Sequence, residues 1–317
     1  MGTDGALHVA SLGGTGARRA LPARALAQAR LAREILLTRG RSHAYGDDPS
    51  QRAELHVPAR GGPHPLVVLI HGGSWRKRYG KRVMRALARD LRRRGFAVWN
   101  IEDRRVGNGG GWPATFADVG AAIDYLATLE APLDLARASV VGHSAGGHLA
   151  LWAAGRSRLA PGAPGAPSES AERAGVRFTT AVALAGVCDL EGAYRRWRGG
   201  VVRALMGGSP RDFPERFANA DPMARVPLDV PVLLVHGVKD ATVSIELSRS
   251  YARAASAAGG SVELVEIDGE AGAHRAHIDP RTDAWSVVAG WLERACRAHA
   301  GGYEENERAS ATSSRTP

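Results

Sequence analysis

The chain has 317 residues, of which 44% are hydrophobic, and this is enough for one globular domain with a large buried core. No apolar run is long enough to span a membrane, and residues 1–20 lack the apolar core of a secretory signal, so we expect a cytoplasmic protein without a membrane span. The formal net charge of +10 permits a nucleic-acid partner, but the basic clusters lack interleaved aromatic residues and the chain has no zinc-ligand pattern, so nucleic-acid binding is not predicted.

The two ends of the chain differ in composition from its middle. Residues 1–20 are rich in Gly, Ala and Arg, and residues 301–317 lack apolar periodicity, so both are predicted to be mobile tails. Residues 21–300 are predicted to form one domain that begins with a helix over 21–37. The glycines at 13–16 lack the third glycine and the following βα unit of a dinucleotide fingerprint, so no nucleotide cofactor is predicted.

The first predicted central strand covers residues 66–70, a continuous apolar run. It ends in the sequence His-Gly-Gly-Ser-Trp at 71–75, which predicts a glycine turn at the carboxyl end of a strand. Backbone N–H groups in such a turn can point at one carbonyl oxygen together with the N–H after a nucleophile. We therefore expect an oxyanion hole formed by Gly72, Gly73, Ser74 and Ala145.

Arginines dominate the helix that is predicted next, over residues 79–94. Its apolar residues Val83, Leu87 and Leu91 recur at helical spacing, and the arginines fall on the other side. This pattern predicts an amphipathic helix with a solvated basic face.

Strand and helix patterns alternate through the rest of the chain. Such alternation predicts an α/β protein with a mostly parallel central sheet and helices on both faces. The further predicted strands cover 96–101, 140–143, 181–184, 231–235 and 262–267. The further predicted helices cover 115–129, 145–155, 244–258 and 283–297.

The run from Val140 to Leu149 contains the pattern Gly-x-Ser-x-Gly, with Ser144 between a predicted strand and a predicted helix. Gly142 and Gly146 have no side chains, so the strand and the helix can approach closely around a strained serine. The N–H groups at the start of the helix favour developing negative charge beside the hydroxyl. Ser144 is therefore the candidate nucleophile.

Two segments interrupt the alternation. Residues 161–167 alternate Pro, Gly and Ala and predict a surface loop. Residues 190–228 are longer than an ordinary connection and carry aromatic residues among glycines and prolines. They predict either a small cap over the pocket or a helical excursion that packs at the sheet edge.

The candidate acid follows the strand at 231–235. Asp240 lies on the loop after this strand, where open α/β sheets place functional groups. Asp189, after the strand at 181–184, is the alternative, and Asp240 is favoured because it lies one strand later, directly before the segment with the candidate base.

The candidate base lies in the loop after the strand at 262–267, where His274 and His277 compete. With either histidine, the chain order is serine, acid, histidine, which is the order of the α/β-hydrolase fold.

With these motifs, residues 45–295 resemble the compact α/β-hydrolase esterases whose oxyanion motif is HGGxW. That group includes carboxylesterases and arylformamidases. Relatives often read GxxHFxxIDP in the last loop, and this likeness assigns the catalytic histidine to His274, four positions before Ile278. The chain departs from the pattern at Arg275, where relatives have an aromatic residue, and at Asp103, where they have a tyrosine. We expect both departures to place polar groups close to the site.

The resemblance and the ordered residues predict a serine hydrolase that cleaves small carboxylic esters through an acyl-enzyme, with Ser144, Asp240 and His274 as its triad. The alternatives are an arylformamidase and a non-catalytic binding protein with the same fold. No metal or cofactor is predicted, and the expected partner is a small ester or amide, with the oligomeric state left open. The two cysteines, Cys188 and Cys296, are predicted to be buried thiols that form no disulfide.

Overall fold

The computed structural model describes residues 40–173 and 176–297. The predicted N-terminal tail, the helix predicted over 21–37 and the predicted C-terminal tail lie outside these residues. Within the described ranges, no helix is both long and apolar enough to cross a membrane. Cys188 and Cys296 are both free, and Cys188 is buried as predicted, whereas Cys296 is only partly buried.

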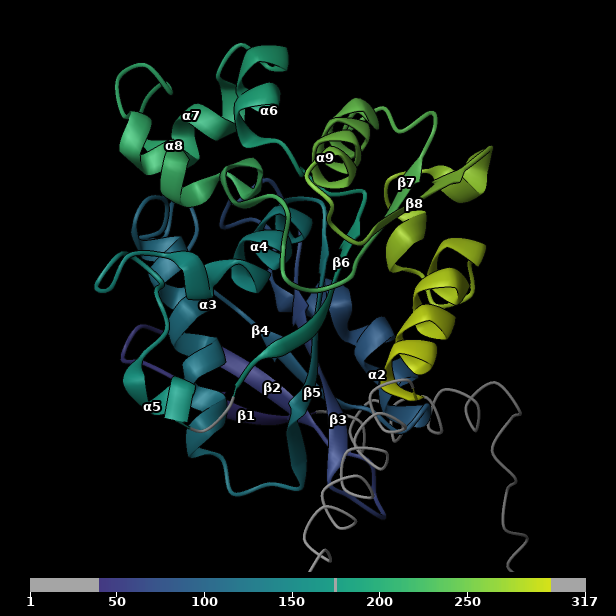
Figure 1. Ribbon diagram of the computed structural model, residues 1–317. Coiled ribbons are helices and arrows are strands. Elements are labelled where there is room, and N and C mark those ends of the chain that lie inside the picture. The colour runs from purple at the N-terminus through teal and green to yellow at the C-terminus, as the bar shows by residue number, and fades with distance from the viewer. Residues whose placement is uncertain (1–39, 174–175, 298–317) are drawn as a thin grey trace, which may run out of the picture. The chain divides into compact units, whose positions relative to one another are not determined.

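An eight-stranded sheet forms the centre of the described chain, with strand order β1-β2-β4-β3-β5-β6-β7-β8. Strand β2 pairs antiparallel with both of its neighbours, β1 and β4, and all other neighbouring strands pair parallel. The predicted mostly parallel α/β sheet is therefore confirmed (Figure 1). The strands are β1 (Arg41–Ala44), β2 (Arg52–His56), β3 (His64–Ile70), β4 (Ala97–Ile101), β5 (Leu133–His143), β6 (Phe178–Leu184), β7 (Val232–Gly237) and β8 (Val262–Ile267).

Helices cover both faces of this sheet. The longer ones are α2 (Arg85–Arg93), α3 (Ala114–Asp124), α4 (Ala145–Ala154), α9 (Glu246–Ala257) and a helix over 283–297. Short 3-10 turns are η1 (Lys81–Met84), η2 (Tyr125–Thr128), η3 (Arg156–Arg158), η4 (Pro222–Arg225), η5 (Glu270–Gly272) and η6 (Ala276–Ile278).

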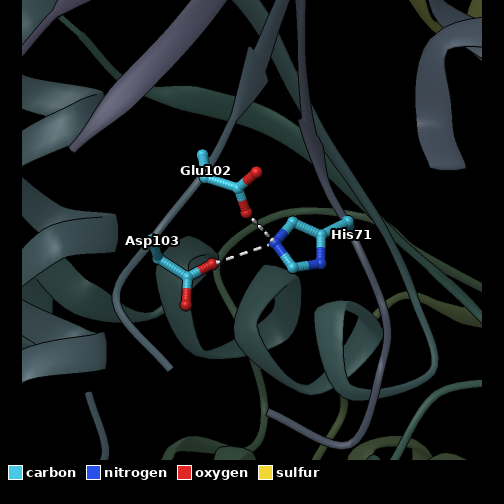
Figure 2. Close-up of side chains that lie close together, drawn as sticks. All are labelled: His71, Glu102 and Asp103. Carbon is cyan, nitrogen blue, oxygen red and sulfur yellow. Dashed lines mark ion pairs between the residues drawn. The ribbon is translucent and has the colours of Figure 1, made fainter. Parts of the chain in front are cut away.

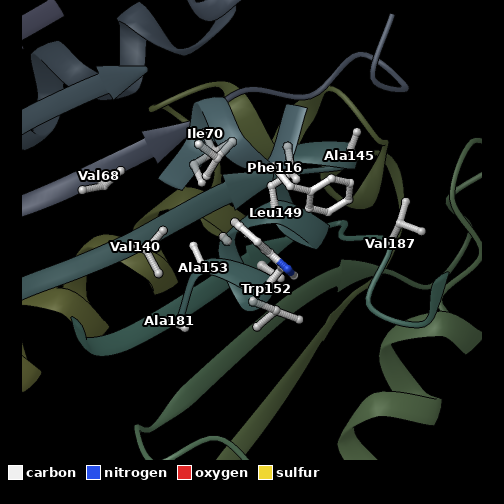
Figure 3. Close-up of a cluster of buried hydrophobic side chains, with 14 of the residues drawn as sticks. Val68, Ile70, Phe116, Val140, Ala145, Leu149, Trp152, Ala153, Ala181 and Val187 are labelled. Atoms are coloured by element: carbon white, nitrogen blue, oxygen red, sulfur yellow. The ribbon is translucent and has the colours of Figure 1, made fainter. Parts of the chain in front are cut away.

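The two faces have separate apolar cores because successive side chains of a strand point to opposite sides. Leu66, Val68 and Ile70 of β3 pack in one cluster with residues of α3 and α4, where Figure 3 shows Ile70 near Leu149 and Phe116. Val67 and Leu69 pack on the side of α2 and the helix over 283–297. Burial on both sides explains why β3 reads as a continuous apolar run.

The basic helix α2 begins later than predicted, and some arginines of its charged face bind other parts of the chain. Leu87 and Leu91 of α2 are buried as the periodicity predicts. Arg85, however, forms an ion pair with the buried Glu54 of β2, and Arg92 donates to the carbonyl of Val57. The prediction of a solvated basic face is therefore wrong for these two arginines, because β2 and the residue after it supply acceptors that the periodicity of one helix does not reveal.

Residues 190–228 contain the helices α6 (Leu190–Arg196), α7 (Gly200–Met206) and α8 (Pro214–Ala220), which group together in Figure 1. Tyr194 and Phe217 join α6 to α8 edge to face, with ring centroids 6.0 Å apart. The carboxylate of Asp221 accepts the N–H groups of Leu190 and Glu191 at 3.1 and 2.9 Å, so the start of α6 is tied to the end of α8.

Residues 161–167 carry no helix, as predicted, and α5 (Glu169–Arg173) follows them. Arg156 holds the loop by donating to the carbonyls of Gly165 and Ala166 at 2.8 and 3.0 Å.

Candidate active site

Ser144 occupies a sharp turn between β5 and α4. Its φ of 57° and ψ of −121° lie in a region that non-glycine residues rarely adopt. A Cβ on Gly142 would lie 1.9 Å from the carbonyl oxygen of Gly146, and a Cβ on Gly146 would lie 2.2 Å from that of Ile70. Both glycines are therefore required for the close approach of strand and helix that the motif predicts.

The structure brings Asp240 and His274 into contact. Nδ1 of His274 lies 2.7 Å from Oδ2 of Asp240, and the Asp240 side chain is buried. Oδ1 of Asp240 accepts the N–H groups of Thr242 and Val243 at 2.8 and 3.0 Å. Burial by itself raises the pKa of Asp240, but the hydrogen bonds from His274 and Val243 outweigh it and lower this pKa below its ordinary value. The carboxylate is thus ionised and positioned to orient the imidazole.

The two alternative residues lie elsewhere. His277 is buried, and its Nδ1 is 3.2 Å from the carbonyl of Ala273 rather than next to a carboxylate. The Asp189 carboxylate accepts the N–H of Gly192 at 2.6 Å and so caps α6. The structure therefore pairs Asp240 with His274, and neither His277 nor Asp189 takes part in this contact.

Two further histidines support this pair and were not predicted to do so. Burial lowers the pKa of His143 to about 3, so its ring is neutral, and its Nε2 lies 2.9 Å from the carbonyl oxygen of His274, a distance at which it donates a hydrogen bond. Burial also lowers the pKa of His236 to about 4. Its Nε2 lies 2.9 Å from the carbonyl of Val243 and 3.6 Å from Oδ2 of Asp240. His143 is the last residue of β5 and His236 the second-last residue of β7, and this position at the carboxyl ends of parallel strands is the sequence signal that could have identified them.

The loops of the acid and the base also approach each other through glycines. A Cβ on Gly237, at the end of β7, would lie 1.7 Å from the carbonyl oxygen of Gly272. Only residues without side chains fit there, and the close approach helps to bring the loop of His274 to that of Asp240.

The turn after β3 has an unusual backbone, with φ of 129° at Gly73 and 53° at both Ser74 and Trp75. A Cβ on Gly72 would lie 2.7 Å from the carbonyl oxygen of His143, so this turn packs directly against the turn that holds Ser144. Ala145 is the first residue of α4, where N–H groups have no intrahelical acceptor. Gly72, Gly73 and Ser74 line one cavity with Ser144 and His274.

Behind this turn, His71 lies against two carboxylates (Figure 2). Its Nε2 is 2.8 Å from Glu102 and 3.4 Å from Asp103, and its Nδ1 is 2.8 Å from the carbonyl of Gly72. Burial alone lowers the pKa of His71, but the hydrogen bonds to Asp103 and Glu102 outweigh it and raise this pKa to about 9. These three contacts are to oxygen atoms, which the doubly protonated ring satisfies as a donor at both nitrogens. Nε2 also lies 3.3 Å from Nη1 of Arg105, which shares Glu102 with His71.

His71, Glu102 and Asp103 place potential metal-ligand atoms within 4.8 Å of one another. Glu102, however, already forms ion pairs with Arg105 and with Lys81, so cations of the chain itself neutralise this cluster. A proton on His71 fits these contacts better than a metal ion. Asp103 is 1% exposed and contacts His71 behind the turn, so it lies close to the site, as predicted, but it does not line the cavity of Ser144 and His274.

Two cavities meet at Ser144. The first, of about 280 Å³, is lined mainly by apolar and small residues, including Trp75, Val187 and Trp197. The second, of about 330 Å³, is lined by His274, Arg275 and Tyr79 among others. Trp197, Gly200 and Val201 come from residues 190–228, so this segment forms one wall of the first cavity. Arg275 faces the second, as the departure from the esterase pattern predicts.

The sequence of the chain matches known esterases. Residues 54–254 match the family model BD-FAE. Esterase LipC of Mycobacterium tuberculosis is 29% identical over 220 residues, which cover 65% of this chain and 52% of LipC. A probable isoprenylcysteine alpha-carbonyl methylesterase of Arabidopsis thaliana is 25% identical over 249 residues, which cover 73% of this chain and 50% of the plant protein. The chain thus spans about half the length of these curated relatives.

Solved structures share the fold. A truncated carbohydrate esterase from gut microbiota superposes with a TM-score of 0.68 at 22% identity, covering 82% of this chain and 98% of that one. Esterase B of Lactobacillus rhamnosis, inhibited by a tributyrin phosphonate, gives 0.67 at 21% identity, covering 90% and 96%. These identities support a shared fold and nothing finer. The family model matches 201 of the 317 residues, more than half of the chain, so the chain belongs to the BD-FAE family, and it has the α/β-hydrolase fold.

Proposed function

We propose that the chain is a serine hydrolase that cleaves small carboxylic esters through an acyl-enzyme. The observation that carries the proposal is that Ser144, on its strained elbow, lines the same cavity as His274, whose other ring nitrogen is 2.7 Å from Asp240. An activated serine needs a base within reach and a group that orients the base. The names of the relatives, an esterase and a probable methylesterase, support the same reaction class.

In the proposed reaction, Oγ of Ser144 attacks the ester carbonyl while Nε2 of His274 accepts its proton. The N–H groups of the turn at 72–74 and of Ala145 stabilise the oxyanion. When the carbon–oxygen bond of the leaving group breaks, His274 returns the proton to the leaving oxygen. His274 then deprotonates a water molecule that attacks the acyl carbon, and it returns this proton to Oγ of Ser144 as the bond between Oγ and the acyl carbon breaks and the acid leaves. Asp240 stays ionised and stabilises the imidazolium that forms twice in this cycle.

The proposal is tested with Ser144→Ala and the matched control Ser286→Ala, which changes an exposed serine on the helix over 283–297. We expect Ser144→Ala to lose about 10⁴-fold or more in kcat on p-nitrophenyl acetate, and to lose labelling by a fluorophosphonate probe. Ser286→Ala should keep both. Full turnover by Ser144→Ala would refute the mechanism, and an unlabelled, inactive wild-type protein would favour the non-catalytic binding protein.

An arylformamidase is the second candidate, because the turn at 71–75 reads HGGSW and amide cleavage uses the same acyl chemistry. Comparing kcat/KM on N-formylkynurenine with that on p-nitrophenyl acetate and butyrate separates the two activities. We expect the esters to be preferred, since a leaving alcohol needs less help than an amine. A preference of more than about a hundredfold for the formamide, nearly 3 kcal/mol, would reverse the order. We keep the prediction that the protein is located in the cytoplasm, whichever of the two reactions it catalyses.

A further inference from the structure

The two cavities at Ser144 divide a bound ester into its two halves. His274 lines only the second cavity, and it must reach the leaving oxygen to protonate it. If Ser144 reacts as proposed, the leaving group therefore lies in the second cavity. The acyl group then lies in the first, against Trp75, Val187 and Trp197.

The leaving-group cavity contains a cation without a partner. Arg275 follows His274 directly, lines this cavity and is exposed. Within residues 40–173 and 176–297, its guanidinium has no hydrogen bond or ion pair, whereas the nearby Arg281 forms an ion pair with Asp279 at 2.6 Å. No carboxylate side chain is among the described residues that line the cavity. A guanidinium in this position is free to bind an anion.

The basic character continues beyond the cavity. A neighbouring hollow of about 310 Å³ shares Tyr79 and Val83 with it, and it adds the side chains of Lys77, Arg78 and Arg82. These three cations have no ion pair in the described part of the chain, and Arg78 lies 5.7 Å from the centre of the Tyr79 ring. The one acid of the hollow, Glu102, is already paired with His71 and Arg105. The positive potential around the leaving group is therefore not cancelled locally.

We propose that Arg275 selects esters whose leaving alcohol or phenol carries a carboxylate. A guanidinium binds a carboxylate through two parallel N–H···O bonds, which fixes the orientation of the leaving group as well as its charge. The inference rests on the proposed esterase function, and it names the substrate class of the same site. The role of Arg275 is to bind substrate, and it takes no part in proton transfer.

A matched pair of esters tests the proposal: 3-(4-acetoxyphenyl)propanoate and its primary amide. The acyl group is the same and the two leaving phenols differ little in acidity, because the charged group is separated from the ring by two methylenes. We expect kcat/KM for the carboxylate ester to exceed that for the amide ester by about 10- to 100-fold, as for a charge-assisted hydrogen bond, mainly through KM.

Three variants assign the preference to Arg275. Arg275→Gln should remove most of the preference for the carboxylate ester, Arg275→Lys should keep part of it, and Arg281→Gln should leave the ratio at the wild-type value. A ratio near one in the wild type, or a ratio that Arg275→Gln does not change, would overturn the proposal while leaving the esterase function intact. Absence of turnover with both esters, together with no fluorophosphonate labelling, would instead overturn the proposed function and this inference with it.

Discussion

His274 and His277 lie three positions apart, but only His274 has a carboxylate at 2.7 Å from its Nδ1. We predict that His274→Ala lowers kcat by about 10³-fold or more, and that Asp240→Asn, which favours the wrong tautomer of His274, lowers it by about 10⁴-fold. His277→Gln should stay within about tenfold of the wild type. Steady-state kinetics on p-nitrophenyl acetate provide the measurement, with circular dichroism to confirm that each variant is folded.

The opposite result is equally clear. An inactive but folded His277→Gln beside an active His274→Ala would transfer the base to His277. It would also mean that the Asp240–His274 contact has only a structural role.

His71 makes the stability of the chain depend on pH. Because its pKa is raised from the ordinary 6.5 to about 9, the folded state favours the protonated ring. The resulting stabilisation is fully present below about pH 6.5 and is lost as the pH rises through about 9. We predict that His71→Gln lowers the free energy of unfolding by about 1.5–3 kcal/mol at pH 6, and that this difference shrinks towards pH 10.

Urea denaturation of both proteins from pH 6 to pH 10 measures this difference. His148→Gln is the control, since burial lowers the pKa of His148 to about 4 and its ring is neutral throughout this range. A His71→Gln difference that is as constant with pH as that of His148→Gln would show that His71 is not protonated in the folded protein.

Local patterns identified Ser144, favoured Asp240 over Asp189 and left His274 and His277 as alternatives, and the resemblance to the esterases was needed to choose His274. Ser144, Asp240 and His274 each follow a predicted strand, and parallel strands bring their carboxyl ends to one edge. The contacts of His71 with Glu102 and Asp103 could not be predicted in the same way. They depend on β3 and β4 being neighbours in register, which pairs Ile70 with Ile101, and no periodicity within one segment reveals which strands are adjacent.

At the scale of elements, α6 and α7 determine the size of the acyl cavity. Trp197 ends α6, and the residues after it form a left-handed turn, with φ of 49° at Arg198 and 86° at Gly199. This turn presents Trp197 beside Gly200 and Val201 in the cavity next to Ser144. If the acyl group binds in this cavity as proposed, Trp197 limits the length of the acyl chain that fits between helices α6 and α7 and Ser144.

We predict that Trp197→Ala shifts the preference from butyrate towards octanoate esters. Each additional methylene that the enlarged cavity buries should raise kcat/KM by about fourfold relative to the wild type, from about 0.8 kcal/mol per methylene. The measurement is kcat/KM across p-nitrophenyl esters of two to ten carbons. Trp291→Ala, on the helix over 283–297 at the other face of the sheet, is the control and should leave the profile unchanged. An unchanged profile in Trp197→Ala would place the acyl chain elsewhere.

The same scale shows which elements the sequence could predict. Strands β3, β4, β6, β7 and β8 match the predictions within a few residues, as do the helices between them when the 3-10 turns η1 and η2 are counted with α2 and α3. Strand β5 was predicted only over 140–143 but begins at Leu133, because its first residues, Leu-Asp-Leu-Ala-Arg, are not a continuous apolar run. Strands β1 and β2 were not predicted, because β2 reads Arg-Ala-Glu-Leu-His and its buried Glu54 is neutralised by Arg85 from α2. A buried acid looks like a surface residue until its partner is known. Residues 190–228 were predicted as either cap or excursion, and only the fold brings Trp197 to the cavity.

For the whole molecule, the relevant property is the formal net charge of +10, which no nucleic-acid motif explains. If the leaving group is anionic, this charge assists its approach to the basic surface beside the leaving-group cavity, and added salt screens the attraction. We predict that raising NaCl from about 20 mM to about 500 mM lowers kcat/KM for 3-(4-acetoxyphenyl)propanoate by about 3- to 10-fold, since the Debye length falls from about 20 Å to about 4 Å.

The uncharged amide ester is the internal control and should change less than about twofold, because it carries no net charge to screen. Arg275→Gln lowers the formal net charge only from +10 to +9, so a weaker salt dependence should persist in this variant. Its persistence would assign part of the attraction to the remaining basic residues, such as Lys77, Arg78 and Arg82. If the carboxylate and amide esters respond equally to salt in the wild type, the net charge has no part in substrate capture, and its explanation must be sought in another partner.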